Sequence, residues 1–124
     1  MRAIIFVAHG SKKEESNQEF IQLVEEISHK DNKYGLKKAA FLELASPDIK
    51  SVVTEFIING AREIVLYPYF LNSGKHVTSD IPNLIEELRE EHKNIMFKLL
   101  PHFGKSEKIE EIVLHDINRP FVIN

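Results

Sequence analysis

The chain has 124 residues, of which 43% are hydrophobic and 28% are charged, so we expect a single domain over residues 1–124. It contains no cysteine, which excludes disulfides, thiolate metal sites and a cysteine nucleophile. Its net charge of -3 argues against a nucleic-acid-binding protein built on a basic face. The apolar run at residues 3–8 is too short for a signal peptide or a membrane span, so we expect a cytoplasmic protein with no membrane partner.

The first predicted unit is a strand followed by a helix. Residues 3–8 are apolar without polar alternation, which is typical of a strand buried on both faces. After a polar loop, apolar residues recur at the i, i+3, i+4, i+7 spacing of an amphipathic helix. These residues are Phe20, Leu23, Val24 and Ile27.

The second unit has the clearest helix boundaries. A strand is predicted at Lys38–Leu44. Ser46, Pro47 and Asp48 then supply an N-cap, a proline for the first helical position and an acidic residue for the first turn. The helix ends at Asn59-Gly60, a pair that suits a left-handed cap. Its apolar stripe consists of Ile49, Val52, Val53, Phe56 and Ile57.

Two further strand–helix units and a short tail complete the chain. Strands are predicted at Glu63–Phe70 and Ile95–Leu100. The tail, Arg119–Asn124, is either a short edge strand or an apolar segment that docks on a partner subunit. The helices that follow the two strands have apolar stripes at Ile81, Leu84, Ile85 and Leu88, and at Ile109, Ile112, Val113 and Ile117.

This fourfold repetition predicts an α/β fold. Right-handed crossovers between parallel strands place helices on both faces, so we expect a single-domain, three-layer sandwich around a four-stranded, mostly parallel sheet. Ligands of such sheets bind outside the carboxyl ends of the strands. The loops that follow the four strands therefore carry the candidate site.

Three of the six histidines fall on these loops, namely His9, His76 and His102. His9 is either a ligand or a histidine tied to a backbone carbonyl at the strand end. Gly10 and Ser11 favour the ligand, because glycine permits a sharp turn and a close approach while serine adds a hydroxyl group. His76 is either a ligand or an ordinary polar loop residue.

Glu43 stands within the apolar stretch of residues 39–45. A carboxylate buried in a central strand needs a cation, a protonated histidine or its own protonation, whereas on an edge strand it can face water. Together with His9 and His76 it would suit a divalent first-row metal ion and could also relay protons. No compact metal motif such as HExxH is present, so only the fold can bring these three residues together.

Three blocks of the sequence carry a family resemblance: His9-Gly10-Ser11 at the end of the first strand, residues 41–47 (FLELASP), and residues 68–82 (PYFLNSGKHVTSDIP). Together they resemble the class II tetrapyrrole chelatases, specifically the short sirohydrochlorin cobaltochelatases of the CbiX family and their ferrochelatase relatives. The resemblance spans most of the chain, and the third block is the most specific. It implies a chelatase-like fold.

The resemblance also implies an activity, the insertion of a divalent metal ion into sirohydrochlorin during cobalamin or sirohaem biosynthesis. Co2+ is the first choice of metal, with Fe2+ or Ni2+ as alternatives, and the ion is a substrate rather than a permanently bound cofactor. His9 would be the base and a metal ligand, His76 the second ligand, and Glu43 would assist metal binding or proton removal. The substrate-binding set would be Ser11, Lys12, Ser46, Leu71, Asn72, Ser73, Gly74, Lys75 and His76.

Several features bear on the partner and on rival functions. Sirohydrochlorin carries many carboxylates, and Lys12, Lys13, Lys75 and Lys105 lie in loops at the same edge, where they could pair with them. The ring is broad for one small domain, so we expect a homodimer that holds it between two facing clefts. A metal or tetrapyrrole carrier without turnover is the main alternative. A histidine phosphatase needs an arginine where Ala8 stands, and a response-regulator receiver needs acidic residues at the first strand end.

Overall fold

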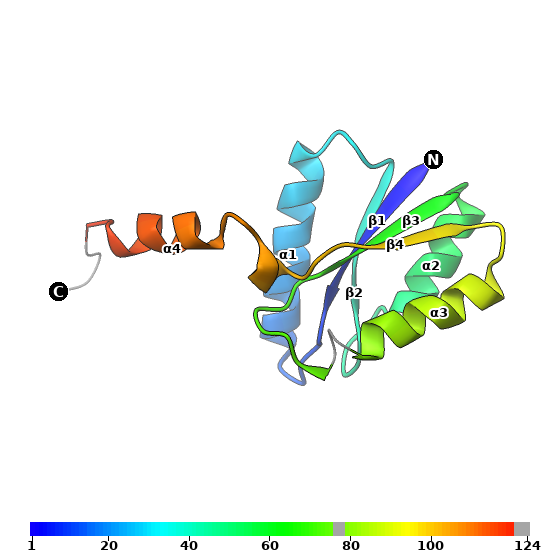
Figure 1. The fold of residues 1–124 in the computed structure, drawn as a ribbon, viewed down its shortest axis with the longest axis horizontal. Helices are drawn as coiled ribbons and strands as arrows, with labels where there is room; N and C mark the ends of the chain where they lie inside the picture. Colours follow the sequence, from blue (N-terminus) through cyan, green and yellow to red (C-terminus); the bar gives the residue numbers. More distant parts are fainter. Residues whose placement is uncertain (76–78, 121–124) are drawn as a thin grey trace.

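The computed structural model describes residues 1–75 and 79–120. Strands and helices alternate along the chain, with a short 3-10 turn, η2, before the last helix (Figure 1). The elements are β1 (Arg2–Ala8), α1 (Glu14–Lys30), β2 (Leu36–Phe41), α2 (Ile49–Ile58), β3 (Glu63–Pro68), α3 (Ile81–Glu91), β4 (Met96–Leu99), η2 (Phe103–Lys105) and α4 (Ile109–Ile117).

The four strands form one parallel sheet in the order β2-β1-β3-β4. β1 lies at the centre, where Phe6 pairs with Ala39 of β2 on one side and with Tyr67 of β3 on the other. β2 and β4 are the edges. The predicted α/β fold with a four-stranded parallel sheet is therefore confirmed.

Helices cover both faces of this sheet. On one face α1 packs through Phe20 and Val24 against a cluster that includes Phe6 and Phe41. On the other face α2 and α3 pack over Ile5, Leu66 and Phe97, and this cluster forms the larger core. The apolar stripes predicted for these three helices account for the burial, because each stripe faces the sheet.

Three strands end earlier than predicted: β4 by one residue, at Leu99, and β2 and β3 by more, so the expected ends at Leu44 and Phe70 are wrong. β2 ends at Phe41, whose backbone N–H donates to the carbonyl of Pro47 and so closes the loop. Leu44 has a φ of 66°, a left-handed conformation that a strand cannot contain. β3 ends at Pro68, and the residues beyond it belong to the loops that form the functional edge.

The last helix differs from the other three. The predicted helical pattern is present in α4, but none of its residues is buried. Figure 1 shows α4 extending away from the body of the molecule, beyond α1. The tail at residues 121–124 lies outside the described residues, and Arg119 and Pro120 follow α4.

In the described parts of the chain, no helix combines the length and the apolar character that crossing a bilayer requires.

Candidate metal and ring site

The loops after β1 and β2 run side by side beyond the ends of the strands. The backbone N–H of Leu42 donates to the carbonyl of Ala8 at 3.0 Å, and that of Glu43 donates to the carbonyl of His9, also at 3.0 Å. These two bonds continue the pairing of the parallel strands by two residues. They bring Glu43 beside His9 although the two are 34 positions apart in the sequence.

Gly10 makes this close approach possible. It has a φ of 97°, and a Cβ atom at this position would lie 1.8 Å from the carbonyl oxygen of Glu43. No L-amino acid with a side chain can fill that space without moving one of the two loops. The glycine after His9 is therefore needed for the contact between the two loops.

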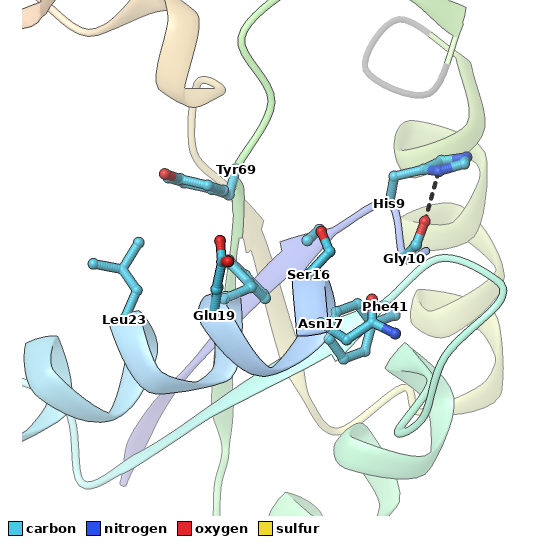
Figure 2. A pocket seen from close by; sticks show the side chains of 10 residues that line it. His9, Gly10, Ser16, Asn17, Glu19, Leu23, Phe41 and Tyr69 are labelled. Atoms are coloured by element: carbon cyan, nitrogen blue, oxygen red, sulfur yellow. Dashed lines mark hydrogen bonds between the residues drawn. The ribbon is translucent and has the colours of Figure 1, made fainter. Parts of the chain in front are cut away.

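The side chains of His9 and Glu43 lie within hydrogen-bonding distance of each other at the carboxyl edge of the sheet. His9 Nε2 lies 2.7 Å from Glu43 Oε1, and the other ring nitrogen, Nδ1, lies 3.1 Å from the carbonyl oxygen of Gly10 (Figure 2). Both side chains are accessible, with exposed fractions of 40% and 55%. An imidazole nitrogen and a carboxylate that share one accessible point are suited to a divalent cation or to the transfer of a proton.

The burial predicted for Glu43 is wrong. Its side chain is exposed and lies in the loop beyond the edge strand, so the alternative, a carboxylate that faces water, is the one observed. The sequence pattern was misleading because the apolar run continues past Phe41 into the loop, where Leu44 is also exposed.

His76 lies outside the described residues, so its expected meeting with His9 and Glu43 stays a prediction. Within residues 1–75 and 79–120, no group of three or more histidine, cysteine, aspartate or glutamate side chains is arranged to hold a metal ion. The described part of the edge thus supplies two candidate ligands, His9 and Glu43.

A pocket of about 440 Å³ opens beside His9. His9 and Gly10 lie at one end of it and Leu23 at the other, with Tyr69 from the loop after β3 along one side (Figure 2). The first turns of α1 contribute the polar side chains of Ser16, Asn17 and Glu19, which are not among the site residues expected from the sequence.

Asn17 holds the loop that carries His9 and Ser11. Its side-chain amide donates to the carbonyl of Ser11 at 2.8 Å, and its Oδ1 accepts from the backbone N–H of Ser11 at 2.9 Å. Asn17 is buried. The sequence contains a signal for the burial of Asn17. Residue 17 precedes Phe20 by three positions and Val24 by seven, so this polar residue lies on the apolar stripe of the helix.

Aromatic rings form an apolar wall next to the pocket. Phe20 and Tyr69 have ring centroids 5.3 Å apart, and Tyr69 and Phe103 have centroids 5.2 Å apart. Tyr69 remains 39% exposed, and Leu71, two positions further along the loop, is also exposed. A flat hydrophobic ligand could pack against such a wall.

The other predicted substrate-binding residues lie on the same loops. Lys12 and Ser46 are exposed after β1 and β2, and Lys75 is exposed after β3. Ser46 precedes Pro47 through a cis peptide bond. The remaining predicted positions between β3 and α3, Asn72, Ser73 and Gly74, are also at the surface.

Ser73 contacts His102, the histidine in the loop after β4. The hydroxyl of Ser73 lies 3.3 Å from Nε2 of His102, and His102 is buried. His102 thus contacts the loop after β3 through Ser73.

The parallel sheet with helices on both faces defines an α/β domain, and it presents an exposed histidine and an exposed carboxylate side by side at its carboxyl edge. Comparison with known proteins specifies the family. The CbiX family model matches residues 3–119, so the chain belongs to the CbiX family, and the resemblance found in the sequence is confirmed.

Relatives of two lengths match this chain. The chloroplastic sirohydrochlorin ferrochelatase of Arabidopsis thaliana is 32% identical over 113 residues, which are 89% of this chain and 48% of that protein. A sirohydrochlorin cobaltochelatase of Saccharolobus islandicus is 28% identical over 127 residues, which cover 98% of this chain and 97% of the relative. This chain therefore spans about half the length of the longer relatives.

The solved structures that match this chain are also of two lengths. A putative cobalamin biosynthesis CbiX protein from Marinobacter aquaeolei superposes with a TM-score of 0.78 and 27% identity, over 97% of this chain and 100% of that one. SirB from Bacillus subtilis with Fe3+ has a TM-score of 0.84 and 26% identity, over 97% of this chain and 48% of SirB. A sirohydrochlorin chelatase SirB from a subspecies of the same organism, in complex with cobalt, has the same TM-score and identity.

Proposed function

We propose that this protein inserts a divalent metal ion into sirohydrochlorin, with Co2+ as the first choice and Fe2+ or Ni2+ as alternatives. The observation that carries the proposal is the accessible His9–Glu43 pair, held at 2.7 Å by two loops at the carboxyl edge of the sheet. Membership of the CbiX family supports it, as do relatives named sirohydrochlorin cobaltochelatase and ferrochelatase.

The chemistry of metal insertion matches what this pair can do. A divalent ion replaces two pyrrole N–H protons, so the site must deliver the ion to one face of the ring and accept protons from it. His9 Nε2 and the Glu43 carboxylate can bind the ion, with His76 as the proposed second imidazole ligand. As the ion passes to the ring, His9 and Glu43 would accept the two protons that it replaces. Their exposure allows the ion to enter and leave without burial of a charge.

The loops around the pair would hold the macrocycle. Tyr69 and Leu71 offer apolar surface to the ring. Lys12 and Lys75 are exposed on two of these loops and would pair with the carboxylates at the rim of sirohydrochlorin. Backbone and hydroxyl groups of Ser11, Ser46 and the segment 71–74 complete the proposed ring-binding surface.

The proposal includes a homodimer in the cytoplasm. The pocket beside His9, at about 440 Å³, is open to one side, and a tetrapyrrole ring needs a second wall. Relatives about twice as long as this chain would supply that wall from the same polypeptide, whereas a second copy would supply it here. The proposed complex places the ring between the two carboxyl edges.

A metallation assay tests the reaction. The protein is incubated with sirohydrochlorin and Co2+ or Fe2+, and the change in absorption of the ring is followed against the spontaneous rate. We expect acceleration that His9→Ala and His76→Ala abolish. His29→Ala is the matched control, because His29 is an exposed histidine on α1 that hydrogen-bonds to the carbonyl of Glu25, away from the edge.

Two results of this assay would contradict the proposal. Ring binding without acceleration would make the protein a tetrapyrrole carrier, and metal binding without ring binding would make it a metal carrier. Initial rates with Co2+, Fe2+ and Ni2+ at matched free concentrations then identify the preferred ion, because the three accept similar ligands and affinity alone does not determine selectivity.

A further inference from the structure

A second pocket opens at the carboxyl edge, beside the ends of β3 and β4. Its volume is about 660 Å³, which lies within the range of small-molecule sites. It shares no described lining residue with the pocket beside His9. The reaction proposed above leaves this pocket without a role.

The loop after β3 runs between the two pockets. Pro68 lines the second pocket, and the next residue, Tyr69, lines the first. Side chains alternate along a strand, so Pro68 lies on the same face as Leu66, the face that α2 and α3 cover. Tyr69 instead packs on Phe20 of α1, with 5.3 Å between the ring centroids. A ligand in the second pocket would therefore contact the other side of this loop.

One wall of the second pocket is apolar. It consists of Pro68, Leu99, Leu100 and Pro101. Leu99 and Leu100 are each 37% exposed, so they offer apolar surface that the chain itself does not cover. Such a wall favours a ligand with an apolar body.

The polar groups of the pocket belong to Ser73, His102 and Lys105. His102 is buried, and its Nε2 lies 3.3 Å from Oγ of Ser73. When Nε2 carries the ring proton, His102 donates to Oγ, and the hydroxyl hydrogen of Ser73 is left to donate to a ligand. The buried histidine can thus orient the exposed hydroxyl.

Lys105 supplies the charge. Its backbone N–H donates to the carbonyl of His102 at 2.9 Å, and residues three apart in a 3-10 turn lie on the same side. Among the described residues, the Lys105 ammonium has no ion-pair partner, and no acidic side chain lines this pocket. An unpaired ammonium beside a hydroxyl donor favours an anion, and a carboxylate accepts from both.

The turn that carries Lys105 is held firmly in place. The backbone N–H of Gly104 in η2 donates to the carbonyl of Phe70 at 2.9 Å. A Cβ atom on Gly104 would lie 1.7 Å from the carbonyl oxygen of Leu71, so η2 is seated closely on the loop after β3. A site formed by such a fixed contact loses little conformational freedom when it binds a ligand.

We propose that this second pocket binds a carboxylate with an apolar body. The Lys105 ammonium and the Ser73 hydroxyl bind the carboxylate, His102 orients the hydroxyl, and the apolar wall receives the body of the ligand. The carboxylate has two possible sources, a free carboxylic acid or a carboxylate arm of the ring proposed above. Only the second source rests on the proposed function.

Titration of the full chain with butyrate, followed by NMR of the backbone amides, tests the pocket. We expect saturable shifts at Ser73, Gly104 and Lys105. Butylamine, which has the same apolar tail and the opposite charge, should leave these amides unchanged. Inorganic phosphate, which has the charge without the apolar body, should bind more weakly than butyrate.

Two variants test the polar groups. Lys105→Met keeps the apolar length of the side chain without its charge, and we expect it to weaken butyrate binding about fivefold or more. Ser73→Ala should also weaken it. The matched control is Lys108→Met, because Lys108 is exposed, lies outside the pocket and pairs with Glu111 at 3.5 Å. Circular dichroism checks that the variants remain folded, which the exposed positions of all three residues favour.

Titration with metal-free sirohydrochlorin identifies the source of the carboxylate. If butyrate competes with the ring and Lys105→Met weakens ring binding, the pocket receives an arm of the ring. If the ring and butyrate bind together and Lys105→Met leaves ring binding unchanged, the ligand is a free carboxylic acid. Either result supports the pocket.

Other results would overturn the pocket. These are an absence of butyrate shifts around η2, equal shifts with butylamine, or undiminished butyrate binding by Lys105→Met. Butyrate binding at the pocket by a protein that does not bind sirohydrochlorin would leave this inference in place and refute the proposed reaction.

Discussion

Single residues set the geometry of the His9–Glu43 pair. The contact between the two side chains depends on the positions of two loops, and the loops touch at Gly10, where the carbonyl of Glu43 occupies the space of a Cβ atom. Behind them, Asn17 holds the backbone of Ser11 by two hydrogen bonds. The two side chains proposed for chemistry are thus positioned by residues that do not bind the metal.

Replacement of Gly10 by alanine should separate the two loops. We expect Gly10→Ala to lower the free energy of unfolding by about 3 kcal/mol or more, through strain at positive φ and the clash with Glu43, and to weaken Co2+ binding. Gly60→Ala is the control, because Gly60 has a similar φ of 98° but open space around its Cβ position. It should cost about 1 kcal/mol and leave Co2+ binding unchanged. Urea unfolding and metal titration measure both effects, and equal losses in the two variants would contradict the role of Gly10.

The contact between Ser73 and His102 should support the loop after β3. Ser73→Ala leaves the ring nitrogen of a buried histidine without this partner, so we expect a loss of about 1 kcal/mol. A double-mutant cycle with His102→Phe isolates the interaction, because the second variant removes the other partner. Urea unfolding of the four proteins gives the coupling energy. If the losses in unfolding free energy of the two single variants add up to that of the double variant, the 3.3 Å contact contributes nothing to stability.

At the scale of elements, α2 is the helix whose start is best specified. Asp48 is its N-cap, and its carboxylate accepts from the backbone N–H of Ser51 at 2.9 Å. Hydrogen bonds from Ser51 lower the pKa of Asp48, with a smaller contribution from Lys50. The ionised form is therefore favoured in the folded protein.

Removal of this cap should have a pH-dependent effect. We expect Asp48→Ala to cost about 1 kcal/mol at neutral pH, while Asp48→Asn, also a good N-cap, costs less. Because the folded pKa lies below the unfolded one, the contribution of the charge is complete above the unfolded pKa of about 3.9 and disappears as the pH falls through the folded pKa. Unfolding measured between pH 7 and pH 2 should show the wild type and Asp48→Asn converging at the acidic end. A constant difference would refute the charge effect.

Across the whole molecule, the order of the strands determines which loops meet. β1 lies between β2 and β3, so the loops after these three strands share one edge, and they carry His9, Glu43 and the segment 69–75. Residues far apart in the sequence thereby line one pocket with the start of α1. The proposed binding at this edge would therefore involve several elements of the fold at once.

Metal binding should therefore stabilise the folded protein as a whole. A ligand present at 100 times its dissociation constant adds about 2.7 kcal/mol when it binds only the folded state. We expect Co2+ to raise the melting temperature of the wild type, to raise it less for Glu43→Gln and not at all for His9→Ala. His29→Ala should behave as the wild type. Thermal unfolding with and without Co2+ measures this, and an unchanged shift in His9→Ala would remove His9 from the site.

Much of the fold followed from short-range signals. Uninterrupted apolar runs and stripes with helical spacing predicted the four strands and four helices. The start that Ser46-Pro47-Asp48 predicted for α2 is two residues too early, because the N-cap is Asp48 instead of Ser46 and Pro47 lies outside the helix. These signals work because burial of one face and capping of one helix end depend on residues within a few positions of each other. The carboxyl edge as the site followed from the parallel topology alone.

Other features arose from contacts between distant segments. In the loop after β2, the backbone of Glu43 pairs with that of His9, and Leu44 adopts a left-handed conformation. The apolar character of the surrounding residues reveals neither of these two features. The outward course of α4 results from the seating of η2 on the loop after β3. Periodicity identifies the side of a helix that needs cover, but the surface that covers it depends on the path of the chain in three dimensions. The amphipathic character of α4 was therefore readable from its own residues, whereas its exposure was not.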